Sequence, residues 1–192
     1  MLLKRYISVY ENFLNKKQLD KFLRFCKTRN YQAGKVGSNI HNCTTNKEIR
    51  DVGLCHLSQR SKSYSEVHWA NVLKIVSLNF FNDYIFKHNL QEYSGRITNV
   101  LQCDILKYGL SNHYKFHVDA LKDENRLLSA IIFLNDDYEG GELVFKNTFD
   151  ETEEKVEKKA GSIVIWPSNF LFPHAVKPVT KGERFTVVAW AR

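Results

Sequence analysis

The chain has 192 residues, 43% of them hydrophobic, which suits one globular domain with its own core. Lysine and arginine exceed aspartate and glutamate by 28 − 21 = 7, a basic balance that only weakly favours an acidic or nucleic-acid partner. No apolar run is long enough to cross a bilayer, no signal peptide is recognisable, and the four cysteines form no CxxC motif, so we expect a cytoplasmic protein with reduced thiols.

The first part of the chain predicts two helices. A short strand is expected over residues 6–10, and Asn15 with Gln18 three positions later can cap the start of an amphipathic helix. A second, longer helix is expected from about residue 64 to about residue 88, where apolar residues recur at helical spacing. Two such helices before a block of strands predict that both pack on one face of a mainly antiparallel sheet, which leaves the other face free for a site.

Residues 31–63, between the helices, are rich in Gly, Asn, Ser and Thr and show no periodicity. We expect a long loop there, with one strand near residues 51–57. Loops of this length inside compact domains are uncommon and tend to cover or bind ligands. Arg50, His41 and His56 are therefore candidate substrate contacts, although residues of these types in loops are more often plain surface residues.

From residue 97 onward the chain is rich in β-branched and aromatic residues divided by turns. The charged stretch over residues 150–159 is interpreted as a solvated excursion between two strands and not as a domain boundary. Many short strands favour a barrel or a two-sheet jelly roll, so the fold class is α+β and mainly β. The expected strands span residues 97–108, 113–120, 126–134, 142–145, 162–166 and 184–191.

His117 and Asp119 form the motif around which the rest of the chain is organised, in the stretch YGLSNHYKFHVD. If this stretch is a strand, residues i and i+2 project from the same face, and the imidazole and the carboxylate point the same way. Two His and one carboxylate with open positions are the ligand set of non-haem Fe(II) oxygenases. An HxD pair alone is common by chance, so a second His is required.

His174 is the candidate for that second His, and Arg184 follows it ten residues later. In the strand expected there, Arg184 shares one face with Thr186, Val188 and Trp190, and no Asp or Glu lies on that face. A buried guanidinium binds a carboxylate bidentately. The missing anion could therefore be a co-substrate.

These residues resemble the Fe(II)- and 2-oxoglutarate-dependent dioxygenases, in particular the prolyl 4-hydroxylase branch. The runs LSAIIFLNDDYEGGELVF, KKAGSIVIWPSN and HAVKPVTKGER look like the bacterial and phage members often described as prolyl/lysyl-hydroxylase type. The resemblance covers roughly residues 97–192, with a weaker likeness across the N-terminal helices.

The resemblance implies a double-stranded β-helix, which is a cupin-like jelly roll, with the N-terminal helices packed on one sheet. It implies a single domain over residues 1–192, with helical support over about 1–95 and a catalytic β core over about 96–192. The cofactor and co-substrates implied are Fe(II), 2-oxoglutarate and O2, with ascorbate as a candidate reductant, in the cytoplasm of a bacterium or of a phage-infected host cell.

Carried over position by position, the resemblance implies that His117, Asp119 and His174 bind Fe(II) and form the catalytic centre. It implies that Arg184 pairs with the distal carboxylate of 2-oxoglutarate. Tyr108, nine residues before the first ligand, matches a tyrosine whose hydroxyl reaches the same co-substrate.

Tyr114 and Trp190 match aromatic positions that line the co-substrate pocket. Strand alternation adds Ile131 and Phe133 as candidates for the pocket wall, although such positions are more often plain core. The prolyl hydroxylases with the closest chemistry more often have Lys where this chain has Arg184. That departure leaves the co-substrate unchanged and the substrate less defined.

The function implied is hydroxylation of an aliphatic C–H, with peptidyl proline as the leading substrate, succinate and CO2 as co-products, and residues 34–61 as a lid that holds the peptide. Alternatives are a lysyl side chain, a free amino acid or a nucleic-acid base. The nucleic-acid branch carries an RxNxTxR pattern after the distal His, which RFTVVAWAR does not match, so that substrate ranks low. A non-catalytic cupin-like peptide-binding module is the alternative from another class, and the complete ligand set argues against it. No membrane partner is expected.

Overall fold

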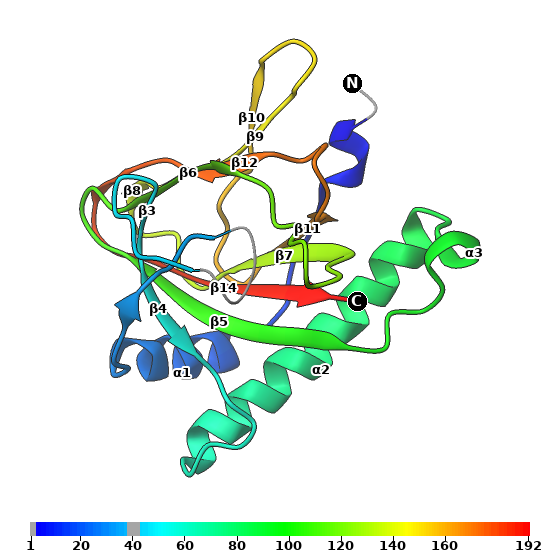
Figure 1. The fold of residues 1–192 in the computed structure, drawn as a ribbon. Helices are drawn as coiled ribbons and strands as arrows, with labels where there is room; N and C mark the ends of the chain where they lie inside the picture. Colours follow the sequence, from blue (N-terminus) through cyan, green and yellow to red (C-terminus); the bar gives the residue numbers. More distant parts are fainter. Residues whose placement is uncertain (1–2, 38–42) are drawn as a thin grey trace.

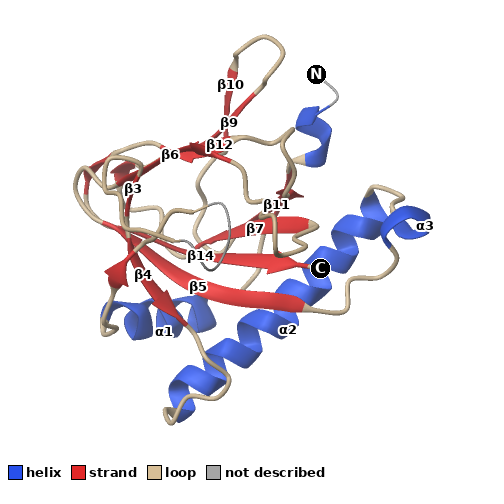
Figure 2. Cartoon of the chain, in the orientation of Figure 1, coloured by secondary structure: helices blue, strands red, loops and turns tan. Residues whose placement is uncertain are grey.

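A computed structural model describes residues 3–37 and 43–192 (Figure 1). The predicted His41 and part of the predicted lid lie outside the described residues. Antiparallel strands dominate the second half of the chain, and helices the first (Figure 2). The helices are η1 (Leu3–Tyr6, 3-10), α1 (Lys16–Lys27), α2 (Tyr64–Lys87) and α3 (Gln91–Ser94). The strands are β1 (Ser8–Tyr10), β2 (Gln32–Ala33), β3 (Arg50–Asp51), β4 (Gly53–His56), β5 (Val100–Tyr108), β6 (His113–His117), β7 (Leu128–Phe133), β8 (Glu139–Gly140), β9 (Leu143–Lys146), β10 (Glu153–Lys155), β11 (Ile163–Pro167), β12 (His174–Val176), β13 (Val179–Lys181) and β14 (Arg184–Ala191).

Two facing antiparallel sheets form the β core, as expected for a jelly roll. The larger sheet has the order β1-β11-β7-β14-β5-β4-β2, and the smaller one has the order β10-β9-β12-β6-β3. In Figure 1 the smaller sheet lies above the larger sheet, and the helices α1 and α2 lie beneath the larger sheet. The predicted arrangement, with both helices on one face of a sheet and the other face free for a site, is confirmed.

The strands of the larger sheet alternate between two cores. On β5, Ile105 belongs to the buried cluster under the helices, whereas Leu106 and Tyr108 belong to the cluster between the two sheets. This period of two follows from the pleat, which turns successive side chains to opposite faces. The helical side of the first cluster includes Phe22, Leu73 and Phe81, and its sheet side includes Ile132, Ile163 and Val187.

The helix α1 starts at the predicted capping box. The Asn15 side chain accepts from the Gln18 backbone N–H at 2.9 Å, and the Gln18 side chain accepts from the Asn15 N–H at 3.2 Å. Both bonds satisfy N–H groups that have no partner within the helix.

We expect Asn15→Ala to lower the free energy of unfolding by about 1 kcal/mol, because one of these bonds is lost. Urea denaturation followed by circular dichroism measures this. Lys17→Ala, at an exposed position on the same helix, is the matched control. Equal effects of both substitutions would contradict the capping role.

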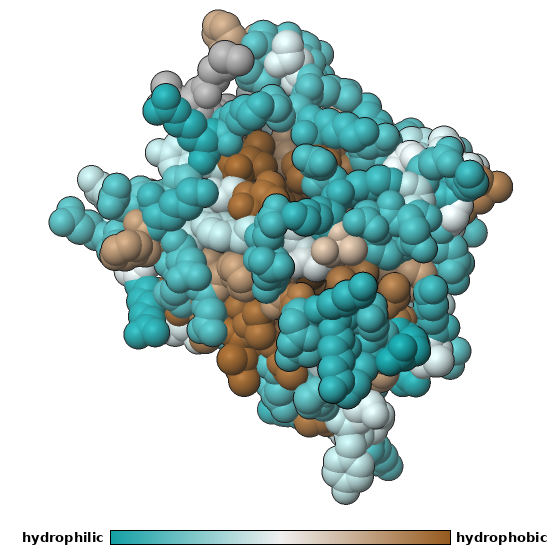
Figure 3. Space-filling view, turned by 180° about the vertical axis from the view of Figure 1, so that it is seen from behind, coloured by the Kyte–Doolittle hydropathy of each residue, from teal (hydrophilic) through white to brown (hydrophobic). Residues whose placement is uncertain are grey.

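The helix α2 differs from the predicted one-sided helix, because it carries apolar residues around most of its circumference. Leu73 and Phe81 face the core, whereas Ile75 and Phe86 are exposed. Figure 3 shows one face of the molecule, on which apolar side chains gather in the middle and hydrophilic ones surround them. Among the described residues, no helix has both the length and the apolar character that crossing a membrane requires.

The structure contains short strands that the sequence did not predict. The strand β10 lies inside the charged stretch over residues 150–159 and pairs with β9 as a hairpin, so that stretch extends the smaller sheet. The strands β12 and β13 have only three residues each, too few for an alternating pattern to be recognised. The strand β5 begins at Val100 and not at residue 97.

Candidate metal centre

A cleft of about 430 Å³ opens between the two sheets. Residues from the larger sheet form one wall, residues from β6 and β12 form the other, and residues 32–37 lie along its edge. The side chains of His117, Asp119 and His174 all line this cleft.

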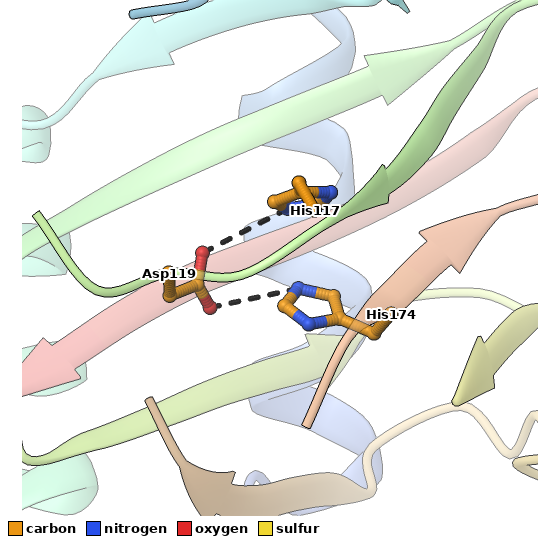
Figure 4. Close-up of side chains that lie close together, drawn as sticks. All are labelled: His117, Asp119 and His174. Carbon is orange, nitrogen blue, oxygen red and sulfur yellow. Dashed lines mark ion pairs between the residues drawn. The ribbon is translucent and has the colours of Figure 1, made fainter. Parts of the chain in front are cut away.

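These three side chains converge on one point (Figure 4). The Nε2 atom of His117 lies 3.8 Å from Oδ1 of Asp119, and Nε2 of His174 lies 3.6 Å from Oδ2 of the same carboxylate. One ligand atom from each residue lies within 4.8 Å of the other two. Among the described residues this is the group whose geometry could hold a metal ion.

Strand pairing brings the two histidines together. His117 is the last residue of β6 and His174 is the first of β12, and the two lie directly opposite each other in the antiparallel pair. Asp119 lies two residues beyond the end of β6 and not within a strand as predicted. Asp119 does lie close to His117, as expected. The reason differs, because only His117 is oriented by the alternation of side chains along a strand.

Backbone carbonyls fix the orientation of both imidazoles. Nδ1 of His117 lies 2.9 Å from the carbonyl oxygen of Lys115, and Nδ1 of His174 lies 3.1 Å from that of Phe172. A proton on Nδ1 that is donated to these carbonyls leaves the Nε2 lone pair free for a metal. Burial, with the adjacent His174, lowers the pKa of His117 to about 3, so His117 is neutral at physiological pH.

The carboxylate of Asp119 is buried, and its Oδ2 has no hydrogen-bond donor among the described residues. Burial opposes its charge, but the two imidazoles, the Ser129 hydroxyl and the Arg126 guanidinium outweigh burial and hold its pKa below the usual range. A buried, unpaired carboxylate is costly unless a cation neutralises it. A divalent cation between one carboxylate and two imidazoles fits this donor set.

Arg184 is fully buried, and it does not line the cleft itself but contacts Tyr108, which does. Its Nη1 donates to the Thr186 hydroxyl at 3.0 Å, but Nε and Nη2 have no acceptor among the described residues. Its guanidinium carbon lies 4.9 Å from the centre of the Tyr108 ring, and Tyr108 lines the cleft. Burial raises the pKa of Tyr108, so its hydroxyl keeps its proton and can donate. Arg184 and Tyr108 together offer hydrogen-bond donors for a planar anion. This agrees with the sequence, in which no Asp or Glu shares the strand face of Arg184.

The predicted aromatic residues both line the cleft. The Tyr114 ring stacks on His117 with the ring centres 3.5 Å apart, and burial raises the pKa of Tyr114 to about 12. Trp190 lies in the opposite wall. Of the two predicted wall residues, Ile131 lines the cleft, whereas Phe133 is buried beneath Arg184.

Two neighbours of the centre were not predicted. Arg126 donates to the Glu124 carboxylate at 2.7 Å and lies over the Trp190 ring, with its guanidinium carbon 3.9 Å from the ring centre. The buried hydroxyl of Tyr138 lies within the field of Arg184, whose positive charge partly offsets the rise that burial gives its pKa. In the sequence Tyr138 stands just before Glu139-Gly140-Gly141, and this glycine pair, which indicates a turn, is the signal that could have pointed to it.

The outer part of the cleft carries a hydrogen-bonded His–Asp pair. Nδ1 of His56 lies 2.7 Å from the Asp104 carboxylate, and the Gln102 amide donates to the other oxygen at 2.8 Å. All three residues line the cleft, and Asp104 is buried. His56 is exposed as well as lining the cleft, so its prediction as a substrate contact stays open beside its interpretation as a surface residue.

We expect the pKa of His56 to lie above its ordinary value, because Asp104 stabilises the imidazolium through the hydrogen bond while burial only partly opposes it. The pair then stabilises the fold below pH of about 6.5 and loses this effect as the pH rises through the raised pKa. An NMR titration of the ring protons should show a lower pKa in Asp104→Asn. Asp20→Asn, which removes an exposed carboxylate on α1, should leave it unchanged. An unaltered pKa in Asp104→Asn would contradict the pairing.

Comparisons with known proteins agree with this geometry. Residues 103–192 match the family model of the 2OG-Fe(II) oxygenase superfamily. A PKHD-type hydroxylase of Alteromonas mediterranea is 40% identical over 97 residues, which are 44% of this chain and 40% of the relative. The aligned part thus spans about two-fifths of the length of that curated relative.

The fold is shared with two solved enzymes. A prolyl-4-hydroxylase of Pseudomonas putida has a TM-score of 0.70 and 20% identity, covering 97% of this chain and 92% of that one. A prolyl hydroxylase of Trichoplax adhaerens, solved with a hypoxia inducible factor peptide fragment, has a TM-score of 0.70 and 17% identity, covering 97% and 83%. Residues 103–192 of the chain therefore match the 2OG-Fe(II) oxygenase superfamily, which implies Fe(II), 2-oxoglutarate and O2, and the chain shares the fold of these two prolyl hydroxylases and has a His-Asp-His cluster that could hold the iron.

Proposed function

We propose that this protein hydroxylates an aliphatic C–H of a peptidyl proline and releases succinate and CO2 as co-products. The observation that carries the proposal is the convergence of His117, Asp119 and His174 in a cleft that Tyr108 also lines, with the buried, incompletely paired guanidinium of Arg184 against the Tyr108 ring. A metal site alone has many uses. A metal site with an anion site behind it fits an oxygenase that binds a dicarboxylate.

His117, Asp119 and His174 hold the Fe(II) in this proposal. When bound together with 2-oxoglutarate and O2, the iron supplies the oxidising power for C–H hydroxylation. The side chains contribute position and charge. The carbonyls of Lys115 and Phe172 keep both Nε2 atoms aimed at one point, and Asp119 supplies a negative charge at neutral pH.

Arg184 and Tyr108 bind the distal carboxylate of 2-oxoglutarate. The guanidinium offers two unused N–H directions, and the phenol offers a proton that burial keeps in place. Both side chains are at most 1% exposed, so this anion would be held away from bulk water. Charge-assisted hydrogen bonds of this kind are about twice as strong as neutral ones.

A peptide lies along the outer cleft, against the described residues of the 34–61 segment and the aromatic ring of Trp190. The Trichoplax enzyme, which binds a peptide fragment, shares this fold and supports a peptide as the substrate class. The whole chain acts as one domain in this proposal, because the helices of the N-terminal part cover the larger sheet and β3 and β4 complete the two sheets. The cytoplasm is the proposed location.

The test measures succinate formed from 2-oxoglutarate by the Fe(II)-loaded protein in air, with ascorbate as reductant. A proline-containing peptide should accelerate turnover and gain one oxygen atom by mass spectrometry. A lysine peptide, free proline and methylated single-stranded DNA are the comparison arms, and hydroxylation in one of these arms instead would replace the proline proposal. If Fe(II) and 2-oxoglutarate bind together but no arm turns over, the non-catalytic peptide-binding module takes its place.

A further inference from the structure

The cleft is lined by both basic and acidic side chains, but only the acidic ones all have partners among the described residues. Three acidic residues line it, and each is already engaged: Asp104 by His56 and Gln102, Glu124 by Arg126, and Asp119 in the metal centre. Lys35 and Arg50 line the cleft as well, and neither forms an ion pair with a carboxylate among the described residues. The outer cleft therefore has a surplus of positive charge.

Arg50 is held rigidly beside the metal centre. Its Nη1 donates to the carbonyl oxygen of Lys35 at 2.7 Å, and its guanidinium carbon lies 4.7 Å from the centre of the Tyr114 ring. Tyr114 in turn stacks on His117. The Nε of Arg50 is buried without an acceptor among the described residues. Because that Nε is closed off from the cleft, an oxygen ligand would meet the guanidinium at Nη2, for which no acceptor is found among the described residues, and a guanidinium fixed on two sides is organised in advance for such a contact.

The metal centre does not need this charge. With the iron and 2-oxoglutarate bound, the two positive charges of Fe(II) and the one of Arg184 balance Asp119 and the two carboxylates of the co-substrate. Arg50 remains over. A buried or half-buried charge without a counter-ion is unfavourable, so a negative group from outside the chain would improve the energy of the complex.

We propose that the substrate is an acidic peptide, and that a carboxylate side chain next to the hydroxylated residue binds Arg50, with Lys35 adding to the attraction. The proposal rests on the proposed peptide substrate and assigns Arg50 as a specificity-determining residue. The chain's net charge of +7 acts in the same direction, because it favours encounter with acidic partners.

The test compares two peptides that differ only in the residue beside the proline, Glu in one and Gln in the other. Binding of fluorescein-labelled peptides is measured by anisotropy with the protein loaded with Fe(II) and 2-oxoglutarate and kept without oxygen. We expect the Glu peptide to bind about ten- to a hundredfold more tightly, as one charge-assisted hydrogen bond allows. This preference should weaken as the salt concentration rises.

Three variants locate the effect. Arg50→Gln should reduce the Glu-over-Gln preference to near onefold, and Arg50→Lys should keep part of it, since Lys retains the charge but lacks the planar fork. Lys181→Gln removes the same charge at an exposed position paired with Glu139, outside the cleft, and should leave the preference and the turnover unchanged. Binding of Mn(II) by paramagnetic resonance shows whether the Arg50 variants keep the metal centre intact.

Two outcomes would overturn the proposal. One is equal binding of the Glu and Gln peptides to the unaltered protein. The other is an Arg50→Gln variant that keeps the preference while its affinity for 2-oxoglutarate falls, which would assign Arg50 to the co-substrate. Because binding is measured without oxygen, failure of proline hydroxylation in air, with the Glu preference present, would count against the proposed function alone.

Discussion

Replacing His174 with alanine should abolish Fe(II)-dependent succinate formation, with turnover reduced by at least about 10³-fold. The substitution removes one of the two imidazoles from the cluster that we propose holds the iron, and it leaves the Asp119 carboxylate without one of its two imidazole neighbours. Metal affinity should fall with it. Losing only an outer partner of a metal ligand typically costs 10- to 100-fold in affinity, so the loss of a ligand itself should cost more.

The measurement pairs the succinate assay with calorimetric titration of Mn(II) into the protein without oxygen. His113→Ala is the matched control, because His113 lies on the same sheet, in β6, but not in the cluster. It should retain metal binding. Tight metal binding by His174→Ala would show that the cluster is not the iron site, whatever happened to turnover.

Replacing Arg184 with methionine should separate stability from binding. In the protein without co-substrate the guanidinium is fully buried and only one of its donors has an acceptor, so an apolar side chain of similar length should leave the melting temperature unchanged or raise it. Affinity for 2-oxoglutarate should fall by about 10²-fold or more, because the carboxylate loses a bidentate partner. Thermal denaturation with and without 2-oxoglutarate measures both effects in one experiment.

The unaltered protein should gain stability with 2-oxoglutarate by mass action, and Arg184→Met should not. Arg184→Lys should fall between the two, because Lys keeps the charge without the planar fork. A large drop in melting temperature for Arg184→Met without 2-oxoglutarate would instead make Arg184 a structural residue of the core.

The candidate site could be predicted largely because its chemistry limits the residue types. Few combinations of His, Asp and Arg fit a metal with a dicarboxylate, so the order of His117, Asp119, His174 and Arg184 along the chain was informative before any contact was known. Helix periodicity and the capping residue Asn15 predicted the helices in the same local way.

Other parts depend on contacts between distant segments. Arg50 meets Tyr114 only because β3 pairs with β6, and β3 has two residues, too few for a pattern. Tyr138 reaches Arg184 through a turn at Gly140, whose φ of 69° and close contact with the Pro178 carbonyl leave no room for a Cβ. Such approaches are set by tertiary packing, so a single sequence carries little signal for them.

The short chain segment from β3 to β4 ties the two sheets together at the edge of the cleft. Residues 50–51 pair with β6 of the smaller sheet, and residues 53–56 pair with β5 of the larger one, with Val52 buried between them (Figure 1). The covalent backbone therefore links the two sheets. At this edge the gap between the sheets cannot widen without breaking the hydrogen bonds of β3 with β6 or of β4 with β5. Under the proposed function, substrate and product would then enter and leave the cleft elsewhere than at this edge.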